Sequence, residues 1–152
     1  MIDTYLDRLI DEINLYKDQF DTIETIYIGG GTPSMLKIEQ LEKLFKALSP
    51  IRPLEYTIEI NPDSYSKEKG ELFKTYGLNR ISLGVQSFND DILKYVNRKH
   101  NKQQIFDAVS HLKTIGIPYI SIDLIYAIPG QTMELIKQDL DYAHQLDITH
   151  IS

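Results

Sequence analysis

The chain has 152 residues, of which 42% are hydrophobic and 25% are charged, a composition that suits a packed globular domain and excludes a disordered or fibrous protein. Its formal net charge is −6, from 16 basic and 22 acidic residues, and no basic block occurs, which argues against nucleic acid as a partner. The longest apolar region, residues 115–128, is interrupted by Pro118, Ser121 and Asp123, so the sequence predicts a soluble protein without a membrane span.

Two further features concern the location of the protein. The first residues lack the basic and then apolar pattern of a secretory signal, and the chain contains no cysteine. Both observations fit a cytoplasmic protein, and a cytoplasmic location is therefore expected.

Helical and strand-like patterns alternate along the chain. Apolar residues at helical spacing, together with the helix that Gly77 ends, predict helices over residues 6–13, 38–48, 71–76, 105–112 and 135–140. Short β-rich runs between them predict strands over residues 22–28, 55–60, 80–85, 118–125 and 147–152.

Turn and cap residues agree with this division. Asn61-Pro62 and Pro129-Gly130 close two of the strands. Asn101 is placed to cap a helix, with Gln104 at the third helical position. Alternating strands and helices with right-handed crossovers imply a parallel sheet, either open and doubly wound or curled as in a (β/α) barrel. Periodicity alone does not separate these two architectures.

The turn after the first predicted strand is the most informative segment. Residues 25–34 read TIYIGGGTPS, in which a β-branched strand runs into three glycines and Thr-Pro. Glycine lacks a Cβ and tolerates positive φ, so a ligand can approach the backbone there, although a tight strand-to-helix connection is the alternative. The order is not G-x-G-x-x-G, and no Lys follows as in a P-loop, so neither nucleotide fingerprint is present.

Polar residues also occur at the ends of the following predicted strands. They are Glu59 with Asn61, Gln86 with Ser87, and Asp123. The carboxyl ends of parallel strands form the ligand-binding edge in both candidate architectures. The sequence therefore predicts a site for a small polar ligand at that edge.

Four segments, YIGGGTPS, EINPDS, RISLGVQSFNDDILKYVNRKH and ISIDLIYAIPGQT, resemble the oxygen-independent coproporphyrinogen III oxidase-like radical SAM proteins. They follow one another in the family's order and span nearly the whole chain. The resemblance implies a partial, curved (β/α) barrel with five of its six parallel strands present. It also implies that S-adenosylmethionine lies across the carboxyl edge, where the residues by themselves place a ligand.

The resemblance further implies cofactor-binding roles for seven residues. Gly30, Gly31 and Thr32 match the positions that meet the methionine end of the cofactor, and Glu59 matches an acidic position that accepts from its ammonium or ribose groups. Gln86, Arg98 and Asp123 match three more contact positions, with Arg98 suited to the methionine carboxylate. The alternatives are a structural pairing of Glu59 with a cation, a structural Asp123, and Arg98 as a solvated helix end. No catalytic residue and no metal ligand is expected here, and the histidines show no ligand spacing.

The chain departs from this family in one respect, because the C-x-x-x-C-x-x-C loop that holds the family's [4Fe–4S] cluster is absent. We therefore expect residues 1–152 to be a fragment of a radical SAM core domain, with the cluster motif before Met1 in the full-length protein only. Such a fragment is expected to be inactive by itself, since the electron reaches S-adenosylmethionine through the cluster.

Within the family, two functions are open, a haem chaperone and the oxidase that decarboxylates coproporphyrinogen III. Asn61, Ser34 and the SFNDD and NRKH segments favour the chaperone branch. The implied partners are porphyrin or haem, an electron donor for the full-length protein, and a peripheral membrane or haem-acceptor protein contact. Outside the family, a non-radical (β/α) protein that binds a phosphorylated metabolite at its glycine turn is the third hypothesis.

Overall fold

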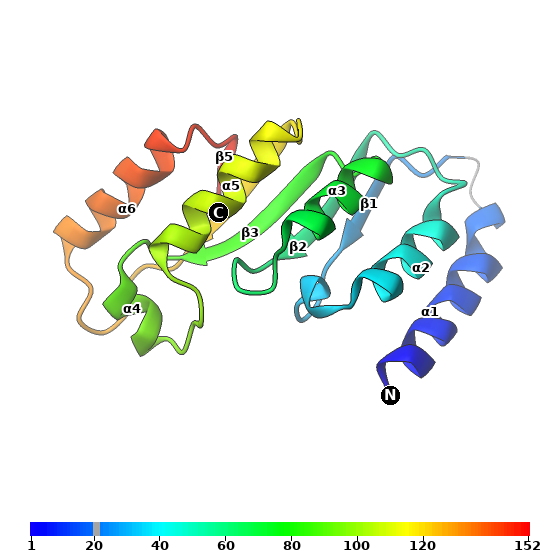
Figure 1. Cartoon of the computed structure of the whole chain (residues 1–152), viewed down its shortest axis with the longest axis horizontal. Coiled ribbons are helices and arrows are strands. Elements are labelled where there is room, and N and C mark those ends of the chain that lie inside the picture. The colour runs from blue at the N-terminus through cyan, green and yellow to red at the C-terminus, as the bar shows by residue number, and fades with distance from the viewer. Residues whose placement is uncertain (20–21) are drawn as a thin grey trace.

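The computed structural model describes residues 1–19 and 22–152, in which strands and helices alternate (Figure 1). The strands are β1 (Thr25–Ile28), β2 (Glu55–Ile60), β3 (Arg80–Gln86), β4 (Tyr119–Leu124) and β5 (His150–Ile151). The helices are α1 (Ile2–Tyr16), α2 (Ile38–Leu48), α3 (Lys67–Thr75), α4 (Asp90–Tyr95), α5 (Lys102–Thr114) and α6 (Met133–Gln145), with short 3₁₀ helices η1 (Lys17–Gln19) and η2 (Pro33–Met35).

The five strands form one parallel sheet in the order β1-β2-β3-β4-β5. When neighbouring strands follow in chain order, right-handed crossovers place every connecting helix on the same face. Figure 1 shows α2, α3 and α5 together in front of the strands. A doubly wound sheet carries helices on both faces, so the barrel-type alternative is the correct one, and the predicted partial (β/α) barrel is confirmed.

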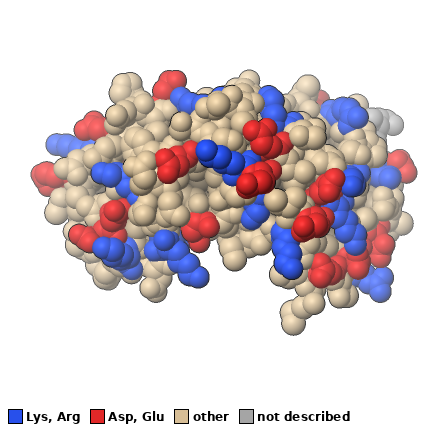
Figure 2. All heavy atoms as spheres, in the orientation of Figure 1, with Lys and Arg blue, Asp and Glu red and all other residues tan. Residues whose placement is uncertain are grey.

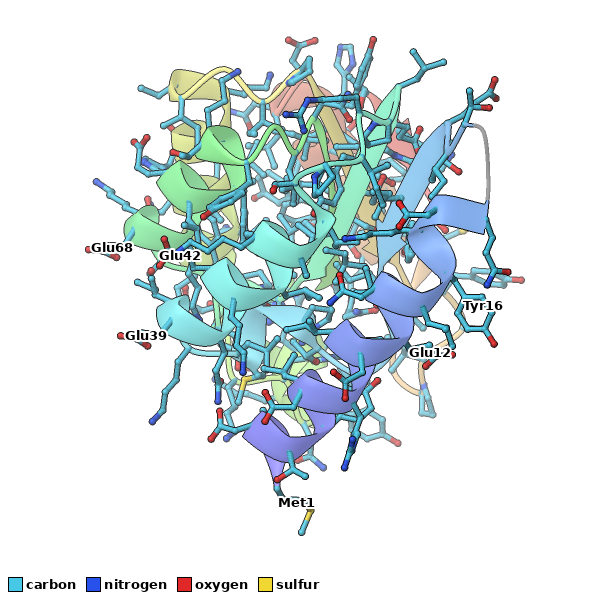
Figure 3. The ribbon with its side chains drawn as sticks, turned by 90° about the vertical axis from the view of Figure 1, so that its right-hand side faces the viewer. Met1, Glu12, Tyr16, Glu39, Glu42 and Glu68 are labelled. Atoms are coloured by element: carbon cyan, nitrogen blue, oxygen red, sulfur yellow. The ribbon has the colours of Figure 1, made fainter. Side chains whose placement is uncertain are left out.

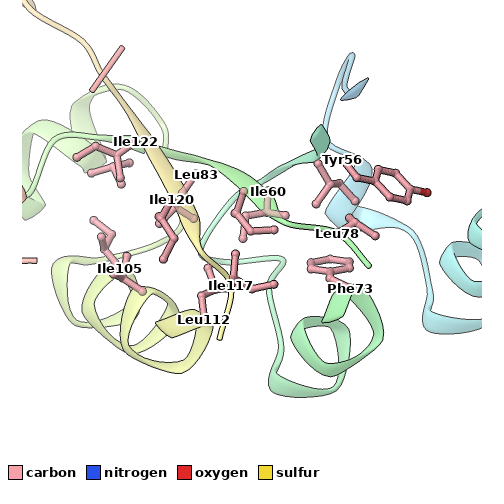
Figure 4. Packing of buried hydrophobic residues seen from close by; sticks show 14 of the residues in the cluster. Tyr56, Ile60, Phe73, Leu78, Leu83, Ile105, Leu112, Ile117, Ile120 and Ile122 are labelled. Atoms are coloured by element: carbon pink, nitrogen blue, oxygen red, sulfur yellow. The ribbon is translucent and has the colours of Figure 1, made fainter. Parts of the chain in front are cut away.

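The two faces of the sheet differ in chemistry because side chains alternate along each strand. In β2, Tyr56, Ile58 and Ile60 are buried under the helices, whereas Glu55 and Glu59 point to the opposite face and are half-buried. The core lies between the sheet and the helices, where Ile105 and Leu112 of α5 meet the isoleucines of β4 (Figure 4). The uncovered face of the sheet is therefore the polar one.

Three predicted strands extend beyond the observed ones, by one residue at each end in β4 and by more in β1 and β5. Residues 22–24 precede β1 because Glu24 O accepts hydrogen bonds from the backbone nitrogens of Leu54 (2.7 Å) and Glu55 (3.2 Å), and regular pairing begins only at Thr25. At the other end, β5 is limited to His150–Ile151. The hydroxyl of Thr149 accepts from Ile120 N (2.9 Å) and donates to Ile120 O (2.8 Å), so a side chain replaces part of the backbone ladder there.

The caps follow the sequence, and one helix is additional. Asn101 and Gln104 form the predicted capping box of α5, and Gly77 follows the end of α3 with φ +80°. Helix α4 is not predicted, since six residues are too few to show a helical period. It begins where the side chain of Asn89 accepts hydrogen bonds from Asp91 N and Ile92 N, both at 3.0 Å.

The outer surface of the helix layer carries charges of both signs, and they are interspersed on the face that Figure 2 shows. Acidic side chains such as Glu12, Glu39, Glu42 and Glu68 point outward from α1, α2 and α3 (Figure 3). Among the described residues, the structure contains no helix that is both long and apolar enough to cross a membrane.

Candidate cofactor-binding site

A cavity of about 190 Å³ lies at the carboxyl ends of the strands. Its walls include six of the seven predicted site residues, namely Gly31, Thr32, Glu59, Gln86, Arg98 and Asp123. The seventh, Gly30, adjoins them, because its backbone nitrogen donates a hydrogen bond to Glu59 Oε2 at 3.2 Å. Residues from four successive strand–helix units thus meet at one edge of the sheet.

The three glycines of the turn are used in different ways. A Cβ at Gly29 would lie 2.5 Å from Tyr27 Cε1 and 2.9 Å from Glu59 Oε1, so Gly29 allows close packing. Gly30 and Gly31 have φ of +81° and +69°, and a Cβ at either would meet no protein atom within 4 Å among the described residues. The backbone at Gly30 and Gly31 is consequently bent in a way that suits glycine and is open to a ligand.

The carboxylate of Glu59 is fixed by two neutral donors. Tyr27 Oη donates to its Oε1 at 2.6 Å, and Gly30 N donates to its Oε2 at 3.2 Å. Burial and the bond to Glu59 raise the pKa of Tyr27 above its ordinary value. The alternative of a structural pairing of Glu59 with a cation does not describe this contact, and each carboxylate oxygen keeps a lone pair for a further donor.

Asp123 faces the same cavity from β4. Ser82 Oγ donates to its Oδ2 at the long distance of 3.5 Å. Burial, followed by the negative charge of Glu59, raises the pKa of the Asp123 carboxyl. One long hydrogen bond leaves most of its acceptor capacity free, which differs from a fully paired structural carboxylate.

Gln86 and Arg98 complete the wall from β3 and the segment after α4. Gln86 is buried, with 7% of its surface exposed, and has φ +69° although it is not a glycine. Arg98 is half-buried, and within the described residues no carboxylate lies at ion-pair distance from its guanidinium. An arginine that lines a cavity without an internal partner can pair with an anionic group of a ligand.

A polar network supports the turn from behind. Asn61 Nδ2 donates to Thr32 Oγ1 at 3.3 Å, and Asn61 N donates to Ser34 Oγ at 3.2 Å. Lys69 Nζ donates to Ser34 O at 2.6 Å and to Ser64 O at 2.8 Å, and burial lowers the pKa of this ammonium. The lysine therefore joins the turn after β1 to the loop after β2.

Tyr27 and Ser82 also belong to the site, although the sequence patterns do not assign them to it. Tyr27 does not pack in the core: it is 56% exposed, and its hydroxyl donates a hydrogen bond to Glu59. Strand alternation is the signal that identifies both residues. Tyr27 lies two positions before Gly29, Ser82 pairs with Glu59 in the β2–β3 register, and all face the uncovered side.

A wider hollow, of about 500 Å³, lies elsewhere, beside residues 22–24 and 50–54. It adjoins the amino ends of β1 and β2. Parallel α/β proteins of the barrel type bind ligands at the opposite, carboxyl edge. The smaller cavity, where the chemically distinctive residues meet, is therefore the candidate ligand site.

The charged residues of the smaller cavity suit a ligand that carries both positive groups and a carboxylate. Two acids, Glu59 and Asp123, face one base, Arg98. S-adenosylmethionine carries a sulfonium, an ammonium and a carboxylate, and the open glycine backbone fits its approach. The volume is below the roughly 300–1,000 Å³ of sites that enclose a small molecule, so part of such a ligand would lie across the open edge.

An iron–sulfur cluster is a different case. Such clusters are held by thiolates, and the 152 residues include no cysteine. The residues present do not fit this group, and no reaction step through a cluster is assigned to them.

The chain belongs to the radical SAM superfamily, whose sequence profile matches residues 3–143. It is 43% identical over 155 aligned residues to the haem chaperone HemW of Lactococcus lactis, with 99% of this chain and 40% of that protein covered. It is 39% identical to the Bacillus subtilis haem chaperone HemW and 32% identical to the oxygen-independent coproporphyrinogen III oxidase of Synechocystis. The family predicted from the sequence is confirmed.

Solved structures agree with this assignment. The Escherichia coli coproporphyrinogen III oxidase HemN, a radical SAM enzyme, superimposes with a TM-score of 0.88 at 31% identity, covering 99% of this chain and 37% of that one. The radical SAM methyltransferase TsrM of Kitasatospora setae matches with a TM-score of 0.75 at 17% identity, which shows the shared fold alone. The chain spans about two fifths of the length of the curated relatives it matches.

Proposed function

We propose that this chain is the S-adenosylmethionine-binding part of a radical SAM core domain that acts in haem or porphyrin metabolism. The observation that carries the proposal is the convergence of Gly30, Glu59, Gln86 and Asp123 on one edge, beside the guanidinium of Arg98, which forms no ion pair within the described residues. Members of the superfamily use S-adenosylmethionine together with a [4Fe–4S] cluster. Here we propose the first ligand only, since the chain has no thiolate for the second.

In this proposal, each polar group of the cofactor is bound by a residue of matching charge or hydrogen-bonding capacity. Arg98 pairs with the methionine carboxylate, and backbone carbonyls of Gly30 to Thr32 accept from its ammonium group. Glu59, held by Tyr27 and by the glycine turn, accepts from an ammonium or ribose donor without having to reorganise. Asp123 and Gln86 serve ribose hydroxyl or adenine donors on the far side of the cavity.

The experiment is a titration of the chain with S-adenosylmethionine, followed by amide chemical shifts. With no iron to chelate the amine and carboxylate, a few net hydrogen bonds of about 1 kcal/mol each give a dissociation constant on the order of millimolar. Shifts should concentrate at residues 29–32, 59, 86 and 123. S-adenosylhomocysteine, which lacks the sulfonium charge, should bind more weakly.

A pair of matched variants tests whether the site's acid is responsible. Glu59→Gln should weaken binding of S-adenosylmethionine several-fold, whereas Glu39→Gln, which removes an outward-facing acid from α2, should leave it unchanged. Equal affinities for both variants, or shifts scattered over the helix layer, would refute the proposed site.

For the parent protein we propose a haem chaperone rather than an oxidase. The support is that the HemW chaperones of Lactococcus lactis and Bacillus subtilis are 43% and 39% identical to this chain, whereas the Synechocystis oxidase is 32% identical. Asn61 and Ser34, which favour that branch, lie in the network that supports the glycine turn. Haem is then the cargo, and a haem-acceptor protein, a peripheral membrane contact, an electron donor and a cytoplasmic location belong to the same proposal.

The test needs the protein that carries this segment together with a reconstituted cluster. We expect a stoichiometric absorbance change on titration with haem and no conversion of coproporphyrinogen III. Oxidative decarboxylation at rates typical of enzymes would instead establish the oxidase. A phosphorylated metabolite is disfavoured as ligand, because two acids against one base repel a phosphate.

A further inference from the structure

Helix α6 contributes a buried carboxylate that is absent from the predicted site. Asp139 is 4% exposed, and within the described residues no cation forms an ion pair with it. Its Oδ2 accepts from Ser87 Oγ at 2.8 Å, and its Oδ1 accepts from Phe88 N at 2.7 Å. Burying an acid without a counter-ion costs free energy. We therefore expect the hydrogen bonds that Asp139 accepts to stabilise a particular backbone conformation of their donors.

That conformation is the turn at the end of β3. Ser87 N donates to Val85 O at 2.9 Å, and the residue between them, Gln86, has φ +69°. This three-residue turn with a positive central φ is a rare and strained form of γ-turn. It coincides with a register shift, because Gly84 pairs with Asp123 while Gln86 pairs with Leu124.

The turn sets the place of the Gln86 side chain. A Cβ at Gly84 would lie 3.1 Å from Gln86 Nε2, so the carboxamide folds back over Gly84 at the cavity. Strain of this kind persists only where neighbouring groups hold it. His100 Nε2 donates to Val85 O at 3.1 Å on one side of the turn, and Asp139 takes the two donors on the other side.

We propose that Asp139 is a positioning residue, which holds the strained turn and thereby keeps the Gln86 carboxamide at the ligand edge. The inference rests on the proposed S-adenosylmethionine site and deepens it, since α6 then shapes a site that it does not line. A role confined to fastening α6 to the sheet would lower stability and leave ligand affinity unchanged.

The first experiment is a double-mutant cycle on cofactor affinity. Asp139→Ala and Gln86→Ala should each raise the dissociation constant of S-adenosylmethionine about three-fold or more, and the double variant should be no weaker than either, because both remove the same contact. Asp139→Asn should restore most of the affinity, since its amide oxygen still accepts from Phe88 N. Additive losses would overturn the proposal.

The control for stability is Ala143→Gly, one turn further along α6 at a buried position. It weakens the helix by roughly 1 kcal/mol and leaves the carboxylate of Asp139 in place. We expect wild-type affinity for this variant under conditions where it is folded. If its affinity falls as far as that of Asp139→Ala, general loosening of α6 is the cause and Asp139 has no positioning role.

A second readout needs no ligand. In Asp139→Ala the side-chain amide resonances of Gln86 should move, and the Ser87 N–H should exchange with solvent faster than in Ala143→Gly. Unchanged Gln86 resonances and Ser87 exchange would overturn the positioning role even if S-adenosylmethionine binds to wild type. Changed resonances without binding to wild type would refute the proposed function and leave the positioning of Gln86 supported.

Discussion

Gly30 and Gly77 have nearly the same φ, so comparing them separates the effect of backbone strain from the effect of lost ligand contact. Gly30 has φ +81° at the cavity, and Gly77 has φ +80° at the end of α3. Neither would bring a Cβ within 4 Å of a described protein atom. A side chain at either position therefore strains the backbone alike, but only at Gly30 would it occupy the space of a ligand.

We predict that Gly30→Ala and Gly77→Ala each lower the free energy of unfolding by about 1 kcal/mol, because alanine disfavours positive φ. The sequence alone leads one to expect that substitution at Gly30 harms the site more than the fold, and the positive φ shows that the fold is affected as well. Only Gly30→Ala should weaken S-adenosylmethionine binding. Urea denaturation and a chemical-shift titration on both variants provide the comparison. Equal affinities for S-adenosylmethionine would mean that the glycine turn does not contact the ligand.

Asp123 gives a prediction with an unusual sign. Burial and the charge of Glu59 raise the pKa of the Asp123 carboxyl in the folded protein. Between the ordinary pKa and the raised one, the folded state holds a proton that the unfolded chain has lost. The contribution of Asp123 to stability is therefore greatest below the ordinary pKa and is lost as the pH rises through the raised one.

Asp123→Asn should therefore raise the melting temperature at neutral pH and flatten part of the decline in stability above about pH 4. Burial also raises the pKa of Asp139, so the rest of the decline in stability should persist in this variant. Thermal melts across pH test this, with the exposed Asp141→Asn as control. A lower melting temperature for Asp123→Asn at pH 7 would contradict the assignment.

At this scale, the sequence identifies side chains that end strands more readily than those within them. Glu59, Gln86 and Asp123 follow from the rule that parallel strands share a carboxyl edge. Ser82 lies in the middle of β3, where alternation must first be assigned, whereas Tyr27 lies one residue before the end of β1, as Glu59 does in β2. Asp139 gives no local signal at all, since its partners Ser87 and Phe88 are reached only by tertiary packing.

At the scale of elements, the capping box of α5 lies directly after the segment that carries Arg98. Asn101 Oδ1 accepts from Gln104 N, and Gln104 Oε1 accepts from Asn101 N, both at 3.0 Å. The helix start therefore fixes the chain three residues after Arg98.

We predict that Asn101→Ala lowers the free energy of unfolding by about 1 kcal/mol and that Asn101→Asp, which keeps an acceptor at the cap, does not. Equilibrium denaturation measures both. An alanine variant as stable as the aspartate variant would show that the hydrogen bonds of the cap contribute little here.

Elements with strong local patterns were predictable, and short ones were not. The 11 residues of α2 show a full amphipathic period, whereas the six residues of α4 depend on the Asn89 cap. β5 is short because the hydroxyl of Thr149, and not a backbone carbonyl, accepts from Ile120 N. The hydrophobic periodicity of the sequence does not predict such a contact.

At the scale of the molecule, the single-faced core predicts a gradient of protection. β2, β3 and β4 are paired on both sides, whereas β1 and β5 are the edges of the sheet. Amide hydrogen exchange should be slowest in β3 and its neighbours and fastest in β5, because edge strands open in local fluctuations that the centre does not share. Equal protection across all five strands would indicate that the described sheet opens only by global unfolding.

The architecture also illustrates where sequence reasoning ends. Alternating strand and helix patterns are common to open and closed parallel sheets, and only the spatial order of the strands distinguishes them. That order depends on which apolar faces pack together across the whole chain, so it emerges from the structure and from the family resemblance, not from any one segment.

The arrangement of the site also bears on how the fold responds to occupancy. Gly30, Glu59, Gln86 and Asp123 belong to four consecutive strand–helix units, each contributing its residue at the same rim. A molecule held by all four joins segments nearly a hundred residues apart, much as a crosslink does, and it favours the state in which they are together. Units that could open separately in the free protein would then be expected to unfold as one in the bound protein, so occupancy should increase cooperativity as well as stability.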